Sequence, residues 1–424
     1  MPQPAHRIEF AVLSDLGMRR LNNQDSAAAS TDGNGGSMPG DLFIVADGMG
    51  AHAAGELASK LAVDNVPHLY RKSKERSPHA ALRHAIHRTN AVIHAKGESS
   101  PDFHGMGTTC TCLVVLDRLA LVAHVGDSRV YRLRRDRLEQ LTFDHSLVWE
   151  MAAAQNVSAD KVPSCIPKNV ITRSLGPHAM VQVDLEGPHE LEPGDVFLLC
   201  SDGLTAVIDD ELMGALLGAM PPEEAARTLV DVANLRGGPD NISVVIARVA
   251  DADPGAKTPP EATPQKPTPG GRRAAAAGLM LAGAIGVVWF ASLSQSFPML
   301  ISAAAAGAGL MLALMGRGAA HPAHPSDTGG PYGNGPYRSI DCQTGEGAAH
   351  ALAEVVAELS ALRDREEKGP DIDWAPFDAA REQAKAKRDA GDVRGSLTSD
   401  ANAIRGLMEQ VRKLAGADSG IFDA

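Results

Sequence analysis

Apolar and polar positions follow two different periods over the first 250 residues. Helical spacing predicts three helices, Gly55–Arg71, Ala80–Lys96 and Glu223–Leu235. Early strands, two consecutive helices and then further strands do not make a regular βαβ repeat. We therefore predict an α+β fold, a four-layer α-β-β-α sandwich with two sheets inside and helices outside. Short apolar runs bounded by Gly, Asp or Pro predict the strands: Ile8–Ser14, Leu42–Ala46, Thr109–Leu116, Leu119–Val125, Val130–Leu133, Val196–Cys200 and Ile242–Val249.

The pattern changes after residue 250. Residues 251–273 are rich in proline and predict an extended linker. Residues 274–315 contain two uncharged apolar runs, and the first is long enough to cross a bilayer as a helix. Arg272 and Arg273 precede the runs and Arg317 follows them, so the positive-inside rule predicts a membrane hairpin with both flanks in the cytoplasm. The alternative is a buried Ala-rich helical pair in a soluble domain, which the absence of charge disfavours.

The last hundred residues divide again. Residues 316–346 are rich in His, Pro, Gly and Tyr and predict a disordered linker. Residues 347–424 predict a helical module, in which Gly369-Pro370 ends the first helix and Thr398-Ser399-Asp400 caps the last. We interpret this module as an interaction domain whose partner is unidentified. Its two apolar faces are Leu352, Val355, Val356, Leu359 and Leu362, and Ala401, Ile404, Leu407, Met408, Val411 and Leu414.

Composition and charge narrow the class of protein. The chain has 424 residues, of which 44% are hydrophobic and 22% charged, as in folded proteins. A net charge of −12 argues against nucleic-acid binding. Five cysteines without a CxxC pair argue against a disulfide framework or a zinc site, and Cys112 and Cys200 are predicted to be core residues. Met1–Phe10 lacks the features of a signal peptide, so we expect the first region in the cytoplasm.

Four aspartates stand within two residues of predicted strands: Asp47, Asp127, Asp202 and Asp240. A strand end fixes a carboxylate at the rim of a sheet, and a neighbouring glycine lets a metal approach the backbone. Oxygen donors without a His or Cys cluster indicate Mg²⁺ or Mn²⁺. Each aspartate alone is weak evidence, because Asp-Gly is a common turn dipeptide. Their combination is more informative.

The order of motifs resembles the type 2C, metal-dependent protein phosphatases over about residues 7–250. The match is to the bacterial branch, whose members commonly oppose Ser/Thr kinases. The motifs are Ser14-Asp15-Leu16-Gly17, Arg20, Asn23-Gln24-Asp25, Ala46-Asp47-Gly48-Met49-Gly50, Met106-Gly107-Thr108-Thr109, Gly126-Asp127-Ser128-Arg129, Leu141-Thr142-Phe143-Asp144-His145-Ser146, Asn169-Val170-Ile171-Thr172-Arg173, Cys200-Ser201-Asp202-Gly203 and Asp240-Asn241-Ile242-Ser243.

This resemblance implies a metal ligand for each of the four aspartates. Asp47 would bridge two Mn²⁺ or Mg²⁺ ions, and the carbonyl of Gly48 would join the first. Asp202 and Asp240 would hold the second ion. Asp127, together with Asp202, matches a third and weaker metal site.

The resemblance also implies the groups around the ions. Arg20 would clamp the substrate phosphate, and a guanidinium suits this role because it donates two parallel hydrogen bonds. Arg20 and Asp47 are thus the predicted catalytic residues. Gln24, Asp25 and Asn241 would support the metal ligands from behind.

The sequence departs from the family pattern at three positions and has one variable segment. Met49 replaces a His that serves some relatives as a general acid, so a water would have to protonate the leaving group. Gln24 replaces a Glu, and Ala51 replaces a Gly, which would strain the loop if φ were positive there. Residues 146–168 match the family's flap, which either tunes substrate choice or is only a packed surface subdomain.

The resemblance implies hydrolysis of phosphoserine and phosphothreonine in proteins at a binuclear metal centre, by an activated hydroxide and without a phosphoenzyme. The expected partners are phosphoproteins, among them Ser/Thr kinases or their substrates. The expected location is the cell membrane, with two membrane helices and with the catalytic domain and the tail in the cytoplasm. Two alternatives are a silent phosphoprotein-binding module and a membrane scaffold that acts through the helical tail.

Overall fold

The computed structural model describes residues 7–31, 38–51, 53–157, 159–163, 165–167, 170–250, 332–342, 346–363 and 372–415. They belong to one compact unit, made of Met1–Pro254 and Pro331–Ala424. The predicted linker 251–273 and the predicted membrane hairpin 274–315 lie outside the described residues. In the described part of the chain, no helix combines the length and the apolar content that a bilayer crossing requires.

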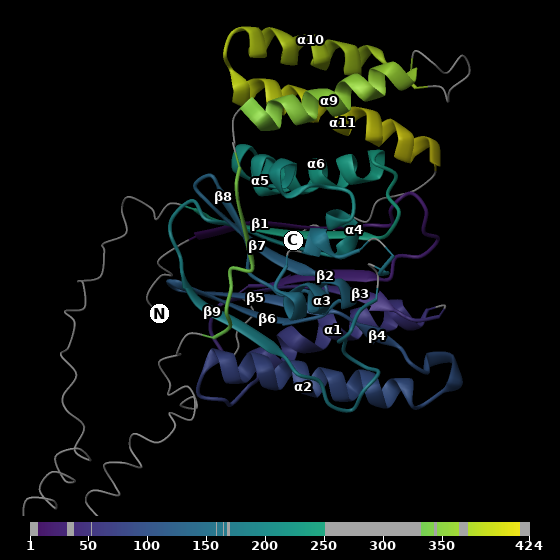
Figure 1. Ribbon diagram of the computed structural model, residues 1–424, viewed down its shortest axis with the longest axis vertical. Helices are drawn as coiled ribbons and strands as arrows, with labels where there is room; N and C mark the ends of the chain where they lie inside the picture. The colour runs from purple at the N-terminus through teal and green to yellow at the C-terminus, as the bar shows by residue number, and fades with distance from the viewer. Residues whose placement is uncertain are drawn as a thin grey trace, which may run out of the picture. The chain divides into compact units, whose positions relative to one another are not determined.

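Two antiparallel sheets form the centre of this unit (Figure 1). The first has the order β1 (Arg7–Asp15), β11 (Ile242–Ala250), β10 (Val196–Cys200), β7 (Arg129–Arg134), β8 (Arg137–Gln140), β12 (Arg338–Asp341). The second has the order β2 (Asp25–Ser30), β3 (Asp41–Met49), β5 (Cys110–Leu116), β6 (Leu119–Val125), β9 (Asp184–Glu190), and β4 (Gly107–Thr108) pairs with the end of β3.

The sheets pack face to face through apolar side chains. Phe43 and Leu113 of the second sheet share one buried cluster with Phe197 and Val245 of the first. The outer faces are covered as well, so β10 is buried along its whole length. A strand that is buried on both faces has a continuous apolar sequence, and for this reason β10 could be predicted.

Helices cover the outer faces of both sheets (Figure 1). The second sheet is covered by α1 (Ala54–Arg71) and α2 (Pro78–Gly97), and the first by α5 (Asp210–Ala219) and α6 (Pro222–Leu235). Ser77 caps α2, since its Oγ accepts a hydrogen bond from the Ala80 amide at 3.3 Å. The three predicted helices and the order of the layers are confirmed.

Several elements were not predicted from the sequence. The strand β2 has the sequence Asp-Ser-Ala-Ala-Ala-Ser, which has little strand propensity, and it forms because it pairs with β3 along its whole length. The helix α5 is apolar on nearly every side, because both of its faces are buried. The other unpredicted elements are β4, β8, β9, β12, α3 (Leu147–Gln155), α4 (Asp202–Thr205), and two short 3₁₀ helices at Pro101–Phe103 and Ala159–Lys161.

The helical tail packs onto the part of the chain that contains the two sheets. It consists of α9 (Glu346–Arg363), α10 (Ala375–Asp389) and α11 (Val393–Ala415), which form a further layer over α5 and α6 (Figure 1). Leu352 of α9 and Ile404 of α11 are fully buried and share one apolar cluster with Leu216 and Leu229. From the predicted apolar faces of the tail, the residues that join this core are Leu352, Val355, Val356 and Leu359 of α9 and Ala401, Ile404, Leu407 and Met408 of α11.

Two predictions about the C-terminal region are wrong. Residues 332–342, predicted to lie in a disordered linker, include β12, and Cys342 is fully buried beside it. The segment is ordered because its backbone pairs with the free edge of β8. The last helix begins at Val393, so the predicted cap lies inside it. Thr398 donates to the Arg394 carbonyl at 3.0 Å, and Asp400 pairs with Arg388 of α10.

Candidate metal centre

The four predicted aspartates come together where the two sheets meet at one end. Asp47 lies near the end of β3, Asp127 and Asp202 each stand two residues after the end of a strand, β6 and β10, and Asp240 stands two residues before β11. Their mutual closeness appears in the pKa of Asp47, which is raised well above its usual range by burial and then by carboxylates that include the other three. The site is therefore built from both sheets, as the predicted strand ends require.

The pKa values report a crowded and partly desolvated carboxylate cluster. Burial, together with nearby Asp202 and Asp144, raises the pKa of Asp127 to about 8. Burial and Asp240 raise the pKa of Asp202, whose carboxyl group shares a hydrogen bond with Asp47. Crowded carboxylates favour protonation unless a cation lies among them. The cluster thus has the electrostatics of a site for divalent cations.

The polar atoms that lack partners fit the same interpretation. Asp127 Oδ1 and Asp202 Oδ1 are buried and have no hydrogen-bond partner, and such orphaned atoms are costly unless a ligand or ion satisfies them. In the described part of the chain, no three His, Cys, Asp or Glu side chains converge tightly enough to enclose a metal ion by themselves. Mg²⁺ sites commonly use one or two carboxylates and keep several waters. The oxygen-only donor set therefore suits a hard, partly hydrated ion.

Gly48 occupies a place where only a glycine fits. Its amide donates to the Gln24 carbonyl at 3.1 Å. A Cβ atom at Gly48 would lie 2.1 Å from the Gly55 carbonyl oxygen and 2.5 Å from that of Gln24. The loop that follows does not show the strain considered from the sequence, because Ala51 is not among the described non-glycine residues with positive φ. Gln24 donates its side-chain amide to the Gly50 carbonyl at 3.3 Å.

Asp25 and Asn241 lie directly behind the cluster. Asp25 is paired with Asp47 across β2 and β3 and accepts a hydrogen bond from Ser201 Oγ at 2.7 Å. Burial and, more weakly, Asp202 and Asp240 raise the pKa of Asp25 to about 7, although its hydrogen bond from Ser201 lowers it. Asn241 accepts from the Gln24 amide at 2.9 Å. Its side-chain amide donates to the carbonyls of residues 16 and 22, at 2.9 Å and 3.1 Å, and so fixes the loop that carries Arg20.

Arg20 lies at the rim of the cluster. Its side chain is 48% exposed, and Nη2 donates to Asp240 Oδ2 at 2.6 Å. The predicted phosphate clamp and one predicted metal ligand are therefore in direct contact. A guanidinium carries five N–H donors, so this ion pair occupies only part of it.

Sequence reasoning assigned no role to the residues that hold the backbone of the cluster. Thr109 Oγ1 accepts from the Asp47 amide at 2.8 Å, and Thr108 Oγ1 donates to the Asp47 carbonyl at 2.9 Å. His145 Nδ1 accepts from the Gly126 amide at 2.9 Å, while its Nε2 contacts Asp184 at 2.9 Å. Thr108, Thr109 and His145 belong to the sequence motifs given above, and this membership is the only feature of the sequence that points to them.

The flap predicted at residues 146–168 contains α3 and the 3₁₀ helix Ala159–Lys161. An isolated bridge between Ser146 and Ile171 closes its base. Val157 is 39% exposed and Val170, just beyond the flap, is 40% exposed. The flap's part in substrate choice stays a prediction.

Comparison with known proteins identifies relatives for this arrangement. A family model described as protein phosphatase 2C matches residues 18–231. The chain is 38% identical over 253 residues to the serine/threonine protein phosphatase PstP of Mycobacterium tuberculosis, a match that covers 59% of this chain and 47% of PstP. It is 36% identical over 250 residues to the protein phosphatase PhpP of Streptococcus pneumoniae, covering 58% of this chain and 99% of PhpP.

The solved structure of the S. agalactiae serine/threonine phosphatase is also similar, with a TM-score of 0.53 and 34% identity. That match covers 57% of this chain and 100% of the other. The chain thus spans about half of PstP and nearly all of PhpP and of the S. agalactiae structure.

Proposed function

Because the chain belongs to the protein phosphatase 2C family, we propose that it is a metal-dependent phosphatase that removes phosphate from phosphoserine and phosphothreonine in proteins. The observation that carries this proposal is the group of crowded carboxylates beside Arg20, with buried oxygens on Asp127 and Asp202 that lack partners. Such a group attracts divalent cations at neutral pH and places a phosphate-binding guanidinium next to them.

One set of residues would hold the metal ions, and another would hold the substrate. Asp47, Asp202, Asp240 and the carbonyl of Gly48 would hold two Mn²⁺ or Mg²⁺ ions, and Asp127 would contribute to a third. When bound, these ions supply charge that offsets a phosphate dianion and a water that is activated for attack. No protein side chain is needed as a nucleophile, so a phosphoenzyme is not expected.

Arg20 would bind the substrate phosphate with the N–H donors that its contact with Asp240 leaves available. Asn241 keeps this arginine near the carboxylates, because it ties down the loop on both sides of Arg20. Met49 carries no transferable proton, so the leaving alkoxide would take its proton from a water in the site.

The membrane hairpin predicted at 274–315 would place this activity at the cell membrane, facing the cytoplasm. The chain leaves the compact unit after β11 and returns to it at β12 in the same unit. A segment that leaves and rejoins one folded body must cross a membrane an even number of times, if it crosses at all. Two spans satisfy this condition and one span does not. Phosphorylated kinases or their targets near the membrane are the expected substrates.

A phosphate-release assay on the full chain tests the proposal. The wild type should release phosphate from a phosphothreonine peptide with Mn²⁺ and not with EDTA. Arg20→Ala should raise KM more than tenfold, since a bidentate phosphate contact is lost. Arg19→Ala, a matched change of the neighbouring exposed arginine, should leave KM unchanged. Peptide binding without Mn²⁺-dependent release would instead identify a silent phosphoprotein-binding module.

A further inference from the structure

Residues 332–342, which we name the strap, run along both sheets of the catalytic part. β12 pairs with β8 of the first sheet, from Arg338 opposite Gln140 to Asp341 opposite Arg137. At the other end of the strap, Tyr332 forms a bridge with Gly187 in β9 of the second sheet, with N···O distances of 2.6 Å and 3.2 Å. The strap comes from beyond the predicted membrane hairpin, and it nonetheless completes edges of both sheets.

One side chain of the strap reaches inward. Arg338 Nε lies 3.2 Å from Asp210 Oδ2, at the start of α5. Asp210 is 8% exposed, whereas the Arg338 side chain is 40% exposed. The other oxygen of Asp210 accepts a hydrogen bond of 3.3 Å from the hydroxyl of Tyr131, which is 1% exposed. The strap is therefore joined to the interior of the first sheet.

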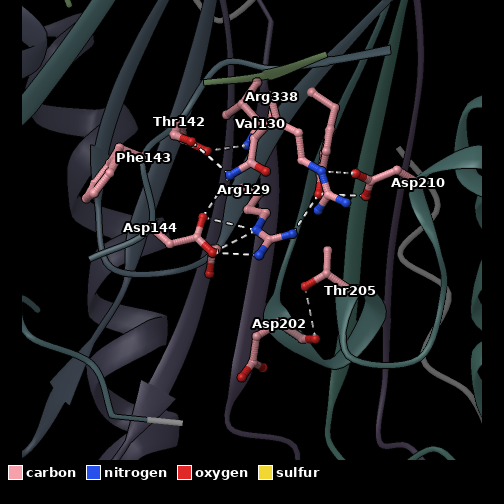
Figure 2. Close-up of polar contacts among 12 residues, drawn as sticks. Arg129, Val130, Thr142, Phe143, Asp144, Asp202, Thr205, Asp210 and Arg338 are labelled. Atoms are coloured by element: carbon pink, nitrogen blue, oxygen red, sulfur yellow. Dashed lines mark hydrogen bonds and ion pairs between the residues drawn. The ribbon is translucent and has the colours of Figure 1, made fainter. Parts of the chain in front are cut away.

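The same hydroxyl joins this contact to a buried arginine. Arg129 Nη1 donates to Tyr131 Oη at 2.8 Å. The opposite side of the guanidinium donates to both oxygens of Asp144, at 2.6–3.0 Å, and Asp144 in turn accepts from Gln140 Nε2 at 2.9 Å. Figure 2 shows Arg129 between Asp144 on one side and Asp210 with Arg338 on the other. The strap is thus connected to Arg129 by two routes. In the first, Arg338 contacts Asp210. In the second, β12 pairs with β8, the strand that carries Gln140.

Arg129 stands next to two of the predicted metal ligands. It lies two residues after Asp127 and is paired with Cys200, two residues before Asp202. Figure 2 draws Asp202 below Arg129 in this view. Arg129 is thus joined through the backbone to both strand ends that carry these carboxylates, so a shift of Arg129 would change the positions of Asp127 and Asp202.

We propose that Arg129 is a positioning residue for Asp127 and Asp202, and that the strap sets its orientation. Arg338 acts on it through Asp210 and Tyr131, so the metal site is completed by a segment that follows the predicted membrane hairpin. The ion pair of Arg338 is partly exposed and contributes little to stability. Loss of this side chain should therefore act on metal binding more than on folding. This inference rests on the proposed metal-dependent function.

The test is a calorimetric Mn²⁺ titration of the full chain without substrate. Arg338→Ala should weaken the weakest Mn²⁺ site by roughly three- to tenfold, as expected for a residue that supports a metal ligand from a distance. Arg338→Lys, which keeps the charge, should recover part of this loss. Ser339→Ala is the matched control on the same strand, because its hydroxyl contacts Arg137 at 2.5 Å on the exposed face. It should bind Mn²⁺ as the wild type does, and all three variants should unfold at the wild-type temperature.

Tyr131→Phe tests the route, because it keeps the buried ring and removes only the hydroxyl. It should weaken the same Mn²⁺ site, and the double variant with Arg338→Ala should lose no more than the larger single loss. Unchanged Mn²⁺ binding in Arg338→Ala, or losses that simply multiply, would overturn the proposal. A wild type that binds Mn²⁺ but releases no phosphate would remove the proposed function. The titration would still decide on the role of the strap.

Discussion

Asp231→Asn should remove a pH-dependent loss of unfolding free energy that arises where α6 contacts the tail. The Asp231 side chain is 3% exposed and accepts a hydrogen bond from Arg412 of α11. Burial and, more weakly, nearby Asp15 raise the pKa of Asp231, whereas Arg412 and Arg405 lower it. The net result is a pKa of about 6 in place of 3.8. Even with its partner in place, this carboxylate is therefore harder to ionise in the folded protein than in the unfolded chain.

The size of the effect follows from this difference in pKa. Between pH 3.8 and about 6 the folded protein binds more protons at Asp231 than the unfolded chain does, so stability falls as pH rises through this window. The difference corresponds to about 3 kcal/mol of unfolding free energy, lost by pH 7. Asparagine does not titrate, so the variant does not lose this free energy as pH rises. The stability of the variant minus that of the wild type should therefore rise by about 3 kcal/mol from pH 3.5 to 7, above a constant offset from the weaker bond to Arg412.

The assay is urea unfolding of the metal-free full chain at several pH values, followed by circular dichroism. Taking the difference between variant and wild type cancels the other buried carboxylates, which titrate in both proteins. Glu223→Gln is the matched control, since Glu223 lies on the same helix with 73% of its side chain exposed, paired with Arg227. Its difference from the wild type should stay within about 0.5 kcal/mol at every pH. A difference for Asp231→Asn that is flat with pH, or that falls as pH rises, would refute the reasoning.

Three further substitutions test the packing of the site and of the tail. Gly48→Ala should lower Mn²⁺-dependent activity at least tenfold in a phosphate-release assay, because its Cβ would lie 2.1 Å from the Gly55 carbonyl oxygen; near-normal activity would contradict this close approach. Asp144→Ala should cost about 3–5 kcal/mol in urea unfolding, since Arg129 would keep a buried charge without its bidentate partner, and a loss below about 1 kcal/mol would be too small for this reason. Ile404→Ala should cost about 2–5 kcal/mol and lower the unfolding midpoint of the whole compact unit; a separate transition for the tail would show that the two parts do not share one core.

The elements that could be predicted from the sequence are those whose residue pattern is typical of a single kind of secondary structure. The hairpin Cys110–Leu116 and Leu119–Val125 is apolar and β-branched, and its side chains are buried as such patterns predict. The strand Asp25–Ser30 and the helix Asp210–Ala219 carry no such pattern, because pairing and burial create them. The strap is the clearest case: its Pro, Gly and Tyr residues are typical of a linker, and the edge of β8 makes it a strand.

The candidate site also has a part that could be predicted from the sequence and a part that could not. Its carboxylates could be predicted, because each follows or precedes an apolar strand and stands in a motif with a known order. The partners of those carboxylates could not, because they depend on which strand ends meet. The bond between Ser201 and Asp25 spans 176 residues, and the contact of Asn241 with the loop at residue 22 spans 219 residues. Such pairs are fixed by the order of strands in the two sheets, which the sequence pattern alone does not reveal.

The most direct test of the account is phosphate release from a phosphothreonine peptide by the full chain, measured against Mn²⁺ concentration for the wild type, Asp47→Ala and Asp117→Ala. Asp47 stands at the centre of the carboxylate cluster, whereas Asp117 is an exposed turn residue between β5 and β6, away from the cluster. We predict saturable Mn²⁺-dependent release by the wild type and Asp117→Ala, and a loss of at least about a hundredfold in Asp47→Ala. Release that needs no divalent ion, or that survives in Asp47→Ala, would contradict it.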